Sequence, residues 1–292
     1  MGDTAGRLNS MLCAIGFGSL QMNCRTYGQS PFISVAVHGG PGAPGSASSL
    51  AKGLSAFGGS LEPLQSAASV NEQVEELASQ IHSYTKEPIT IFGHSWGAWL
   101  TYLLAYSHPE LVRKAILVAS GAFDALYVPQ MDQRRLSRLS NEDAAEYRKI
   151  VSALQGRTER VSDALLSRLG QLAGKADDYC LDPIPDNEDE PVRIDGVQFE
   201  SIWSEASSLR ESGYFMKIAQ SITIPVRVIH GAEDPTPVEG VVTPLRANLK
   251  NLKWYVLEKC GHQPWKERYA RAQFWEIVKA ELLEEGLRIT SR

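Results

Sequence analysis

Five residues between a strand pattern and a helix pattern constrain this chain more than any other stretch. The pentapeptide GHSWG at 93–97 ends the apolar segment PITIFGHS and begins WGAWLTYLLAYSHPE, which is predicted to be a helix that stops before Pro109. A G-x-S-x-G sequence in this position predicts a sharp, strained turn that raises the hydroxyl of Ser95 above the edge of a sheet. The flanking glycines remove side chains that would clash in so tight a bend. The chain is therefore expected to contain a sheet with Ser95 at the end of one strand.

Strand and helix patterns alternate along most of the chain. Continuous apolar runs are typical of parallel strands that are covered on both faces. The expected buried strands are FISVAVHG at 32–39, PITIFGHS at 88–95, KAILVAS at 114–120, PVRVIHG at 225–231 and LKWYVLEKCG at 252–261. Apolar residues at helical spacing predict helices over 70–85 and 267–286. Strands that alternate with helices indicate βαβ units and an α/β fold with a mostly parallel sheet.

Residues 122–220 lack strand patterns and lie between two of the expected strands. They contain three helix patterns, which are NEDAAEYRKIVSAL at 141–154, VSDALLSRLGQLA at 161–173 and ESIWSEASSLRE at 200–211. We therefore expect one core domain made of 1–121 and 221–292, with a helical cap at 122–220 inserted after the strand at 114–120.

Charge and hydropathy exclude two classes of partner. The 29 Lys and Arg residues face 34 Asp and Glu residues, for a formal net charge of −5, whereas nucleic-acid binding needs a basic surface. The chain has no run of about 18 apolar residues of the kind that spans a membrane. The acidic, proline-rich run at 182–191 is interpreted as a solvated loop. Its alternative interpretation is an acidic rim that favours cationic substrates.

The N-terminal segment and the cysteines indicate where the protein works. MLCAIGFGSLQM at 11–22 lacks a convincing cleavage site and leads into NCRTYG at 23–28, so we interpret this region as a first β-hairpin and not as a secretion signal. The four cysteines are scattered and form no C-x-x-C pair. This pattern favours reduced thiols and a cytoplasmic protein.

Ser95 needs two further side chains before it can act as a nucleophile. A base must lie within hydrogen-bond reach of the hydroxyl, and an acid must orient that base. On this kind of turn the acid and then the histidine follow the serine along the chain. His262, in the glycine-flanked loop EKCGHQPW, is preferred to His230, which ends a strand and is expected to bond locally. Asp234 in HGAEDPTP is the expected acid, and its rivals are Glu233 and Asp124.

The loop HGGPG at 38–42 fits a second requirement of acyl-transfer chemistry. The oxyanion that develops on the carbonyl oxygen needs fixed hydrogen-bond donors. One donor is the backbone N–H after the nucleophile, here that of Trp96, and the other comes from the loop after an earlier strand. Bare glycine backbone lets a carbonyl oxygen approach, and Gly40 is the expected second donor. This chemistry requires no metal and no cofactor.

These motifs make the chain resemble the α/β-hydrolase superfamily, and within it the prolyl aminopeptidase (proline iminopeptidase) group of serine peptidases. The resemblance rests on HGGPG at 38–42, GHSWG at 93–97, GAEDP at 231–235 and GHQPW at 261–265. It implies an α/β-hydrolase fold, a mostly parallel central sheet flanked by helices, and a helical cap over the site. One departure is LEPLQSAAS at 61–69, where the superfamily usually has a strand and a D-x-R-G-type turn.

The resemblance also suggests substrate-binding residues in the cap. In that family acidic cap residues hold the free N-terminal amine of the substrate. The family pattern of tryptophan followed by glutamate is matched loosely by SIWSEAS, in which Ser204 follows Trp203 and the glutamate comes one place later, as Glu205. Glu200 is a second candidate for the amine. Trp203 and Tyr214 are the aromatic candidates for contact with substrate.

The sequence thus predicts a serine hydrolase that acts through an acyl-enzyme on a small molecule or a short peptide. The first substrate hypothesis is a peptide with an N-terminal proline or another small apolar residue. The alternative is a carboxylesterase or lactonase for small acyl esters, because the two activities share every catalytic residue. A third hypothesis is a receptor or an inert protein with the hydrolase fold.

Overall fold

The computed structural model describes residues 23–156, 162–183, 192 and 194–289. The part of the predicted hairpin at 11–22 and most of the acidic run at 182–191 lie outside these residues. Cys24, Cys180 and Cys260 carry free thiols. Within the described ranges, no helix has the length and apolar character needed to cross a membrane.

In the part of the chain that the structure describes, a seven-stranded sheet forms the centre of the fold, in the order β1-β3-β2-β4-β5-β6-β7. Its strands are β1 (Cys24–Tyr27), β2 (Phe32–Val37), β3 (Gly59–Pro63), β4 (Ile89–His94), β5 (Val112–Val118), β6 (Val226–Gly231) and β7 (Leu252–Leu257). Only β1 runs antiparallel to its neighbour, which confirms the mostly parallel sheet.

The order of the strands defines where a site can form. The chain builds β3 on one side of β2 and then crosses to place β4 on the other side, so the winding direction reverses between β2 and β4. In open α/β sheets, ligands bind beyond the carboxyl ends of the strands at such a reversal. Val37 pairs with Gly93 at the carboxyl ends of these two strands. The loops at 38–42 and 93–97 therefore leave the sheet side by side.

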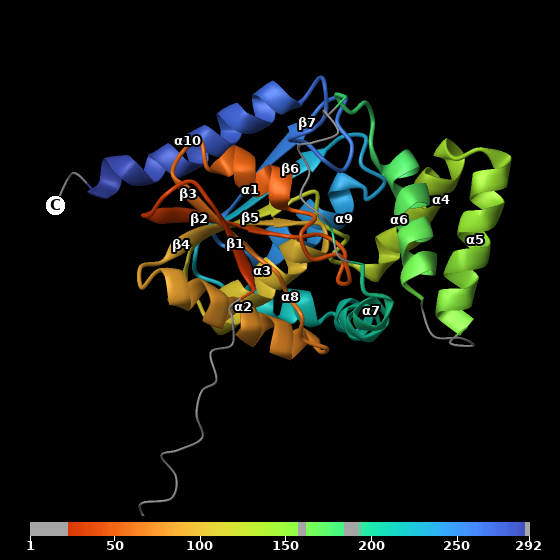
Figure 1. Cartoon of the computed structure of the whole chain (residues 1–292), viewed down its shortest axis with the longest axis horizontal. Coiled ribbons are helices and arrows are strands. Elements are labelled where there is room, and N and C mark those ends of the chain that lie inside the picture. Colours follow the sequence, from red (N-terminus) through yellow and green to blue (C-terminus); the bar gives the residue numbers. More distant parts are fainter. Residues whose placement is uncertain (1–22, 157–161, 184–191, 193, 290–292) are drawn as a thin grey trace, which may run out of the picture.

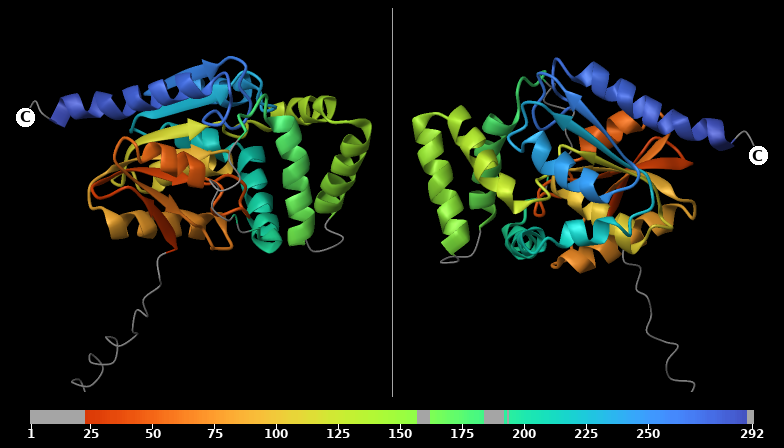
Figure 2. Two further views of the ribbon diagram at one scale, coloured as in Figure 1. Left: turned by 45° about the horizontal axis from the view of Figure 1, so that its top comes forward. Right: turned by 180° about the vertical axis from the view of Figure 1, so that it is seen from behind.

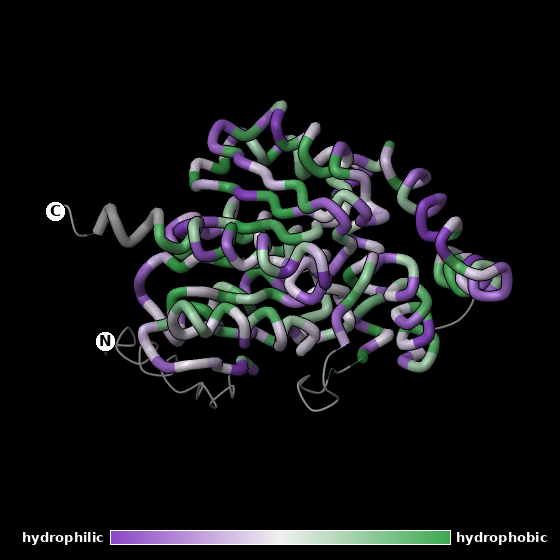
Figure 3. The backbone as a smooth tube through the Cα atoms, turned by 90° about the horizontal axis from the view of Figure 1, so that it is seen from above, coloured by the Kyte–Doolittle hydropathy of each residue, from purple (hydrophilic) through white to green (hydrophobic). Residues whose placement is uncertain are grey.

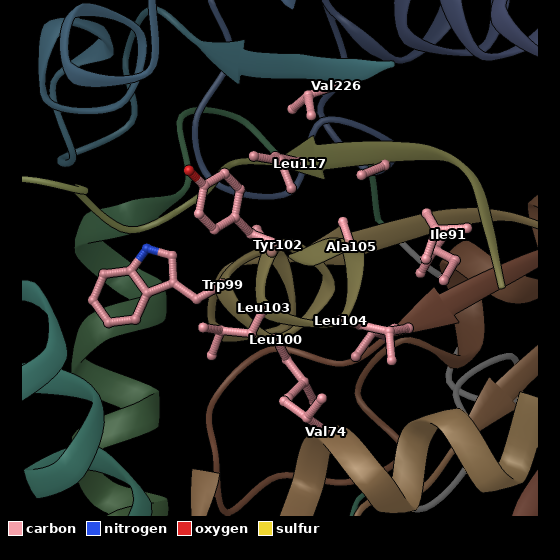
Figure 4. Close-up of a cluster of buried hydrophobic side chains, with 14 of the residues drawn as sticks. Val74, Ile91, Trp99, Leu100, Tyr102, Leu103, Leu104, Ala105, Leu117 and Val226 are labelled. Carbon is pink, nitrogen blue, oxygen red and sulfur yellow. The ribbon is translucent and has the colours of Figure 1, made fainter. Parts of the chain in front are cut away.

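Helices cover both faces of the sheet because side chains alternate along each strand. Ala36, Phe92 and Ile116 pack with α1 (Ser48–Leu54) and α10 (Arg271–Ile289). Their neighbours along the strands, such as Val37 and Ile91, face α2 (Val70–Tyr84), α3 (Trp96–Ser107) and α9 (Val238–Asn248). Figure 4 shows part of this second cluster, and Figure 3 shows hydrophobic residues concentrated on the strands in the middle of the molecule.

The described residues between 122 and 220 form helices that pack in two groups. The elements are η1 (Ala125–Tyr127), α4 (Val128–Arg138), α5 (Asn141–Gly156), α6 (Asp163–Asp177), α7 (Gly196–Glu211) and α8 (Tyr214–Ala219). The helices α4, α5 and α6 share a small cluster centred on Tyr147, Ile150 and Leu172. They stand at one end of the molecule, whereas α7 and α8 lie close to the sheet (Figures 1 and 2) and contribute Ile202 and Phe215 to its hydrophobic cluster.

Four sequence expectations need correction. The last strand, β7, ends at Leu257 and not at residue 261, and only Leu257 in it is buried, because β7 is an edge strand. The sequence pattern does not predict β3, because Gly59–Pro63 is not an apolar run. The strand forms because β1 and β2 pair with its two edges, and all five of its residues are buried. The predicted strand at 114–120 is two residues late, and it ends where Ala119 takes a φ of 45°. The closing helix begins at Arg271 and not at residue 267.

A buried carboxylate on α10 joins this helix to three strands. Glu281 is fully buried; its Oε2 lies 2.7 Å from Nζ of Lys114 and 3.1 Å from Nε of Arg227, and its Oε1 accepts a 2.6 Å hydrogen bond from the Tyr255 hydroxyl. Burial by itself would raise the pKa of Glu281, but the hydrogen bonds from Lys114 and Tyr255 outweigh it and lower the pKa to about 2. The carboxylate therefore stays ionised in the folded protein.

Replacing Glu281 by glutamine is expected to destabilise the fold by about 3–5 kcal/mol at pH 7, because the variant removes the buried negative charge that Lys114, Arg227 and Tyr255 bind. In the wild type the contribution of Glu281 is complete above its ordinary pKa of 4.5 and is lost as the pH falls toward about 2. Urea denaturation at pH 7 and at pH 3 measures both effects. Equal midpoints for variant and wild type at pH 7 would refute this role of Glu281.

Candidate active site

Ser95 occupies the strained turn that its motif predicts. It links β4 to α3 with φ 55° and ψ −113°, and its N–H donates a 3.0 Å hydrogen bond to the carbonyl of Val118. A Cβ on Gly93 would clash with the carbonyl of Gly97, and one on Gly97 would clash with the carbonyl of Val37. Only glycine fits at these two positions. The Ser95 hydroxyl makes no capping bond to α3 and is partly exposed.

Asp234 and His262 meet beyond the carboxyl ends of β6 and β7. Nδ1 of His262 lies 2.7 Å from Oδ2 of Asp234, and since a carboxylate only accepts, Nδ1–H is the donor. Oδ1 of Asp234 accepts a 2.8 Å bond from the Thr236 N–H. The carboxylate is 1% exposed, so both of its oxygens are fixed inside the protein. This arrangement leaves Nε2 of His262 as the nitrogen that can exchange a proton.

The two groups shift each other's protonation. Burial lowers the pKa of His262, but the Asp234 carboxylate outweighs it and holds the pKa above the ordinary 6.5. Burial would raise the pKa of Asp234, but the imidazoles of His262 and His230 bring it below 3.8. Asp234 is therefore the ionised member of the pair, and it stabilises a positive charge on His262.

The rivals for these roles have other partners. Glu233 has a side chain that is 44% exposed and pairs with Arg138 at 3.3 Å. Asp124 caps η1 by accepting a 2.9 Å bond from the Leu126 N–H. His230 is fully buried, and its Nε2 lies 2.8 Å from the carbonyl of Thr236, which confirms the expectation that it bonds locally.

The loop at 38–42 lies against the turn that carries Ser95. A Cβ on Gly39 would lie 3.2 Å from Cβ of Ser95, so this backbone approaches Ser95 closely. Gly40 takes a φ of 55°, which favours glycine. In the described part of the chain, the backbone N–H groups of Gly40 and Trp96 have no acceptor. Both groups are thus free to donate to a ligand.

His94 is a positioning residue that the sequence did not reveal. Its Nε2 lies 2.9 Å from the carbonyl oxygen of His262, and its ring centroid is 4.8 Å from those of His262 and Trp265. Burial lowers the pKa of His94 to about 3, so the ring is neutral and Nε2–H donates to the carbonyl. The turn at 93–97 thus holds the backbone of the loop that carries His262. The only signal in the sequence was that His94 precedes Ser95.

The insertion also holds the His262 loop. The carbonyl of Asp177, at the end of α6, accepts a 2.9 Å bond from the His262 N–H. The Asp177 side chain receives two 2.7 Å bonds from Arg135 on α4. The position of His262 therefore depends on two helices of the insertion.

Glu267 ties the same loop to the chain that follows α6. Its buried carboxylate accepts hydrogen bonds from the backbone N–H groups of Tyr179 at 2.7 Å, Cys180 at 2.6 Å and Gly261 at 2.9 Å. The sequence placed Glu267 at the start of a helix, where a carboxylate gives no sign of this role. The helix starts four residues later, at Arg271, after a turn in which the backbone carbonyl of Glu267 accepts a 3.2 Å bond from the Ala270 N–H.

The cap residues that were expected to bind substrate have mixed positions. Oε2 of Glu205 accepts a 2.7 Å bond from the Val70 N–H at the start of α2. Trp203 is 38% exposed and stacks on Trp99. Tyr214 packs against the hydrophobic cluster of the sheet, and Glu200 is half-buried on α7. Among the described residues, no three His, Cys, Asp or Glu side chains are grouped to hold a metal ion.

The family comparison agrees with this geometry. A family model described as the alpha/beta hydrolase fold matches residues 16–268 of the chain. A curated protein of Mycoplasma pneumoniae with the name "Putative proline iminopeptidase" is 22% identical over 191 residues, which are 59% of this chain and 62% of that protein. The matched region thus spans less than two thirds of that relative.

Solved structures with the same fold have diverse names. The structural match to VinJ covers 89% of this chain and 94% of the VinJ chain, with 17% identity and a TM-score of 0.64. The match to the proline iminopeptidase of Mycobacterium smegmatis covers 91% of this chain and 95% of that protein, with 15% identity and a TM-score of 0.59. The match to Est816, an N-acyl homoserine lactone degrading enzyme, covers 88% of this chain and 95% of Est816, with 15% identity and a TM-score of 0.55. At these identities the likeness establishes the fold alone.

Proposed function

The chain belongs to the alpha/beta hydrolase fold family, and from that premise we propose that it is a serine hydrolase that works through an acyl-enzyme. The observation that carries the proposal is the 2.7 Å hydrogen bond between Asp234 and His262 at the edge of the sheet where Ser95 occupies its strained turn. Along the chain, Ser95, Asp234 and His262 also follow the order serine, acid, histidine that this chemistry has on such a turn.

In the proposed mechanism, Ser95 attacks the carbonyl carbon of the substrate while Nε2 of His262 takes its proton. Asp234 stabilises the resulting imidazolium. The N–H groups of Gly40 and Trp96 bind the oxyanion, and His262 then returns the proton to the leaving group. Water releases the acyl group by the same steps.

The Ser95 hydroxyl makes no hydrogen bond within the described residues. Its contact with His262 therefore belongs to the complex with substrate, as is common for such pairs.

Short peptides with an N-terminal proline or another small apolar residue are the first substrate candidate. The names of the Mycoplasma pneumoniae relative and of the Mycobacterium smegmatis structure support it. The insertion at 122–220 would act as the cap over the site. Glu200 and Glu205 are the sequence candidates for holding the substrate amine, and Oε2 of Glu205 already accepts a hydrogen bond from the Val70 N–H.

Small acyl esters or lactones are the second candidate, and one observation favours them. Holding a free amine requires a carboxylate in the cap, and the Glu205 carboxylate already has one oxygen, Oε2, bonded to the Val70 N–H at the start of α2. An esterase needs no amine-binding carboxylate. The described activity of Est816 on N-acyl homoserine lactones shows that this fold supports such chemistry in another protein.

Initial rates on a proline p-nitroanilide and on p-nitrophenyl butyrate separate the two candidates. An aminopeptidase cleaves the anilide and loses that activity when the proline nitrogen is acetylated, and Glu200→Gln then raises KM. An esterase cleaves the butyrate and leaves the anilide intact. If the enzyme cleaves neither these two compounds nor other acyl substrates, the proposal of a serine hydrolase is wrong.

A further inference from the structure

A buried arginine of the insertion lies beside Trp99, which is on the helix that follows Ser95, and beside Trp203. Arg210, on α7, is only 8% exposed. Its guanidinium carbon is 5.4 Å from the ring centroid of Trp99 and 6.0 Å from that of Trp203. A guanidinium over tryptophan faces is held in place by cation–π attraction, which is stronger when the cation is desolvated.

These aromatic rings connect the two halves of the proposed site. Trp99 lies one helical turn after Ser95 and stacks on Trp203, with ring centroids 6.1 Å apart and planes 9° apart. Trp203 stacks in turn on Phe199, at 5.9 Å and 9°. Phe199 packs against Gly42 of the oxyanion loop, where an added Cβ would lie 2.9 Å from its own Cβ. The stack therefore runs from the nucleophile helix to the oxyanion loop, and Arg210 lies at its Trp99 end.

Arg210 lacks the anion that a buried guanidinium usually has. Its Nε is buried without a hydrogen-bond partner, and no carboxylate among the described residues forms an ion pair with it. Glu211 and Asp132 act on it only through longer-range attraction, and burial lowers the pKa of Arg210. A buried charge without a partner is costly, so a ligand anion that reached Arg210 would recover free energy that the protein alone does not.

We propose that Arg210 binds a carboxylate of the substrate, so that the enzyme acts on acyl compounds that carry a free carboxylate away from the scissile bond. The inference rests on the proposed serine hydrolase function and narrows its substrate class. The planar guanidinium matches a carboxylate with two parallel hydrogen bonds. The tryptophan ring centroids lie 5.4 and 6.0 Å from the guanidinium carbon, and the guanidinium N–H groups would donate to the ligand.

Matched esters test this assignment. Mono-p-nitrophenyl adipate has a free carboxylate, and its methyl ester has the same length without the charge. The wild type is expected to prefer the free acid by about 10- to 100-fold in kcat/KM, as a charge-assisted hydrogen bond predicts. In Arg210→Gln the ratio falls to about one, and Arg210→Lys restores part of it. Arg246→Gln is the matched control, because Arg246 is a surface arginine on α9 whose guanidinium carbon lies 5.8 Å from the ring centroid of Trp254 on β7, outside the site.

A binding measurement makes the test independent of turnover. Adipate is expected to raise the melting temperature of the wild type and of Ser95→Ala, and not that of Arg210→Gln, whereas phosphate at equal ionic strength has no such effect. If wild type and Arg210→Gln respond equally to adipate, or if phosphate replaces it, the carboxylate assignment is wrong. Failure to hydrolyse either ester, with adipate still bound through Arg210, would instead count against the proposed hydrolase function.

Discussion

Replacing Ser95 by alanine is expected to lower kcat by about 10⁴- to 10⁶-fold on any acyl substrate that the wild type cleaves, because no other group can form the acyl-enzyme. The fold is expected to persist. The hydroxyl makes no hydrogen bond within the described residues, and its backbone N–H keeps its bond to Val118. Steady-state rates, with the melting temperature as a check on folding, measure the effect.

Ser55→Ala is a suitable control for this substitution. Ser55 lies at the end of α1, where its hydroxyl donates to the carbonyl of Lys52, and its loss is expected to leave the rates unchanged. A Ser95→Ala variant that kept wild-type activity would show that another residue is the nucleophile. A protein without measurable hydrolysis in either form would favour the alternative of a receptor or inert protein.

Replacing Asp234 by asparagine is expected to lower kcat by about 10⁴-fold. The amide is nearly the same size as the carboxylate but can present its NH₂ group to Nδ1 of His262, which favours the wrong tautomer of the imidazole. Glu233→Gln is the matched control, because Glu233 is the neighbouring acid and pairs with Arg138 instead. If Glu233→Gln caused the larger loss, the assignment of the acid would have to be reversed.

The same variant has a predicted effect on the pH profile. Asp234 raises the pKa of His262 in the wild type. Because the base must be neutral to accept a proton, kcat/KM rises with pH through that pKa. Without the carboxylate the pKa of His262 falls, so the inflection is expected to move to lower pH in Asp234→Asn. An inflection that stayed in place would indicate that Asp234 does not control the charge of His262.

The parts that sequence patterns predicted well depend on local chemistry. Buried parallel strands need continuous apolar runs, so β2, β4 and β6 were found within two residues of their ends. The turn at Ser95 needs glycine at two positions because carbonyl groups fill the space of a side chain. The alternation of strands and helices then suffices to predict the mostly parallel sheet.

The parts that were missed depend on partners distant in the sequence. The Glu205 carboxylate accepts a hydrogen bond from the Val70 N–H, 135 residues away, and the His94 ring donates one to the His262 carbonyl, 168 residues away. β3 contains too few apolar residues to be recognised and exists because two neighbours complete its hydrogen bonds. Such contacts follow from the packing of the whole chain, so no local sequence pattern predicts them.

The most direct test of the proposed function is to locate the covalent acyl-enzyme. The protein is treated with a fluorophosphonate, which reacts with activated serines, and peptides of the labelled protein are weighed and sequenced by mass spectrometry. The proposed mechanism predicts one adduct, on the hydroxyl of Ser95, that forms much more slowly in Asp234→Asn. An adduct on another residue, or labelling of Ser95 at the same rate in both proteins, would contradict it.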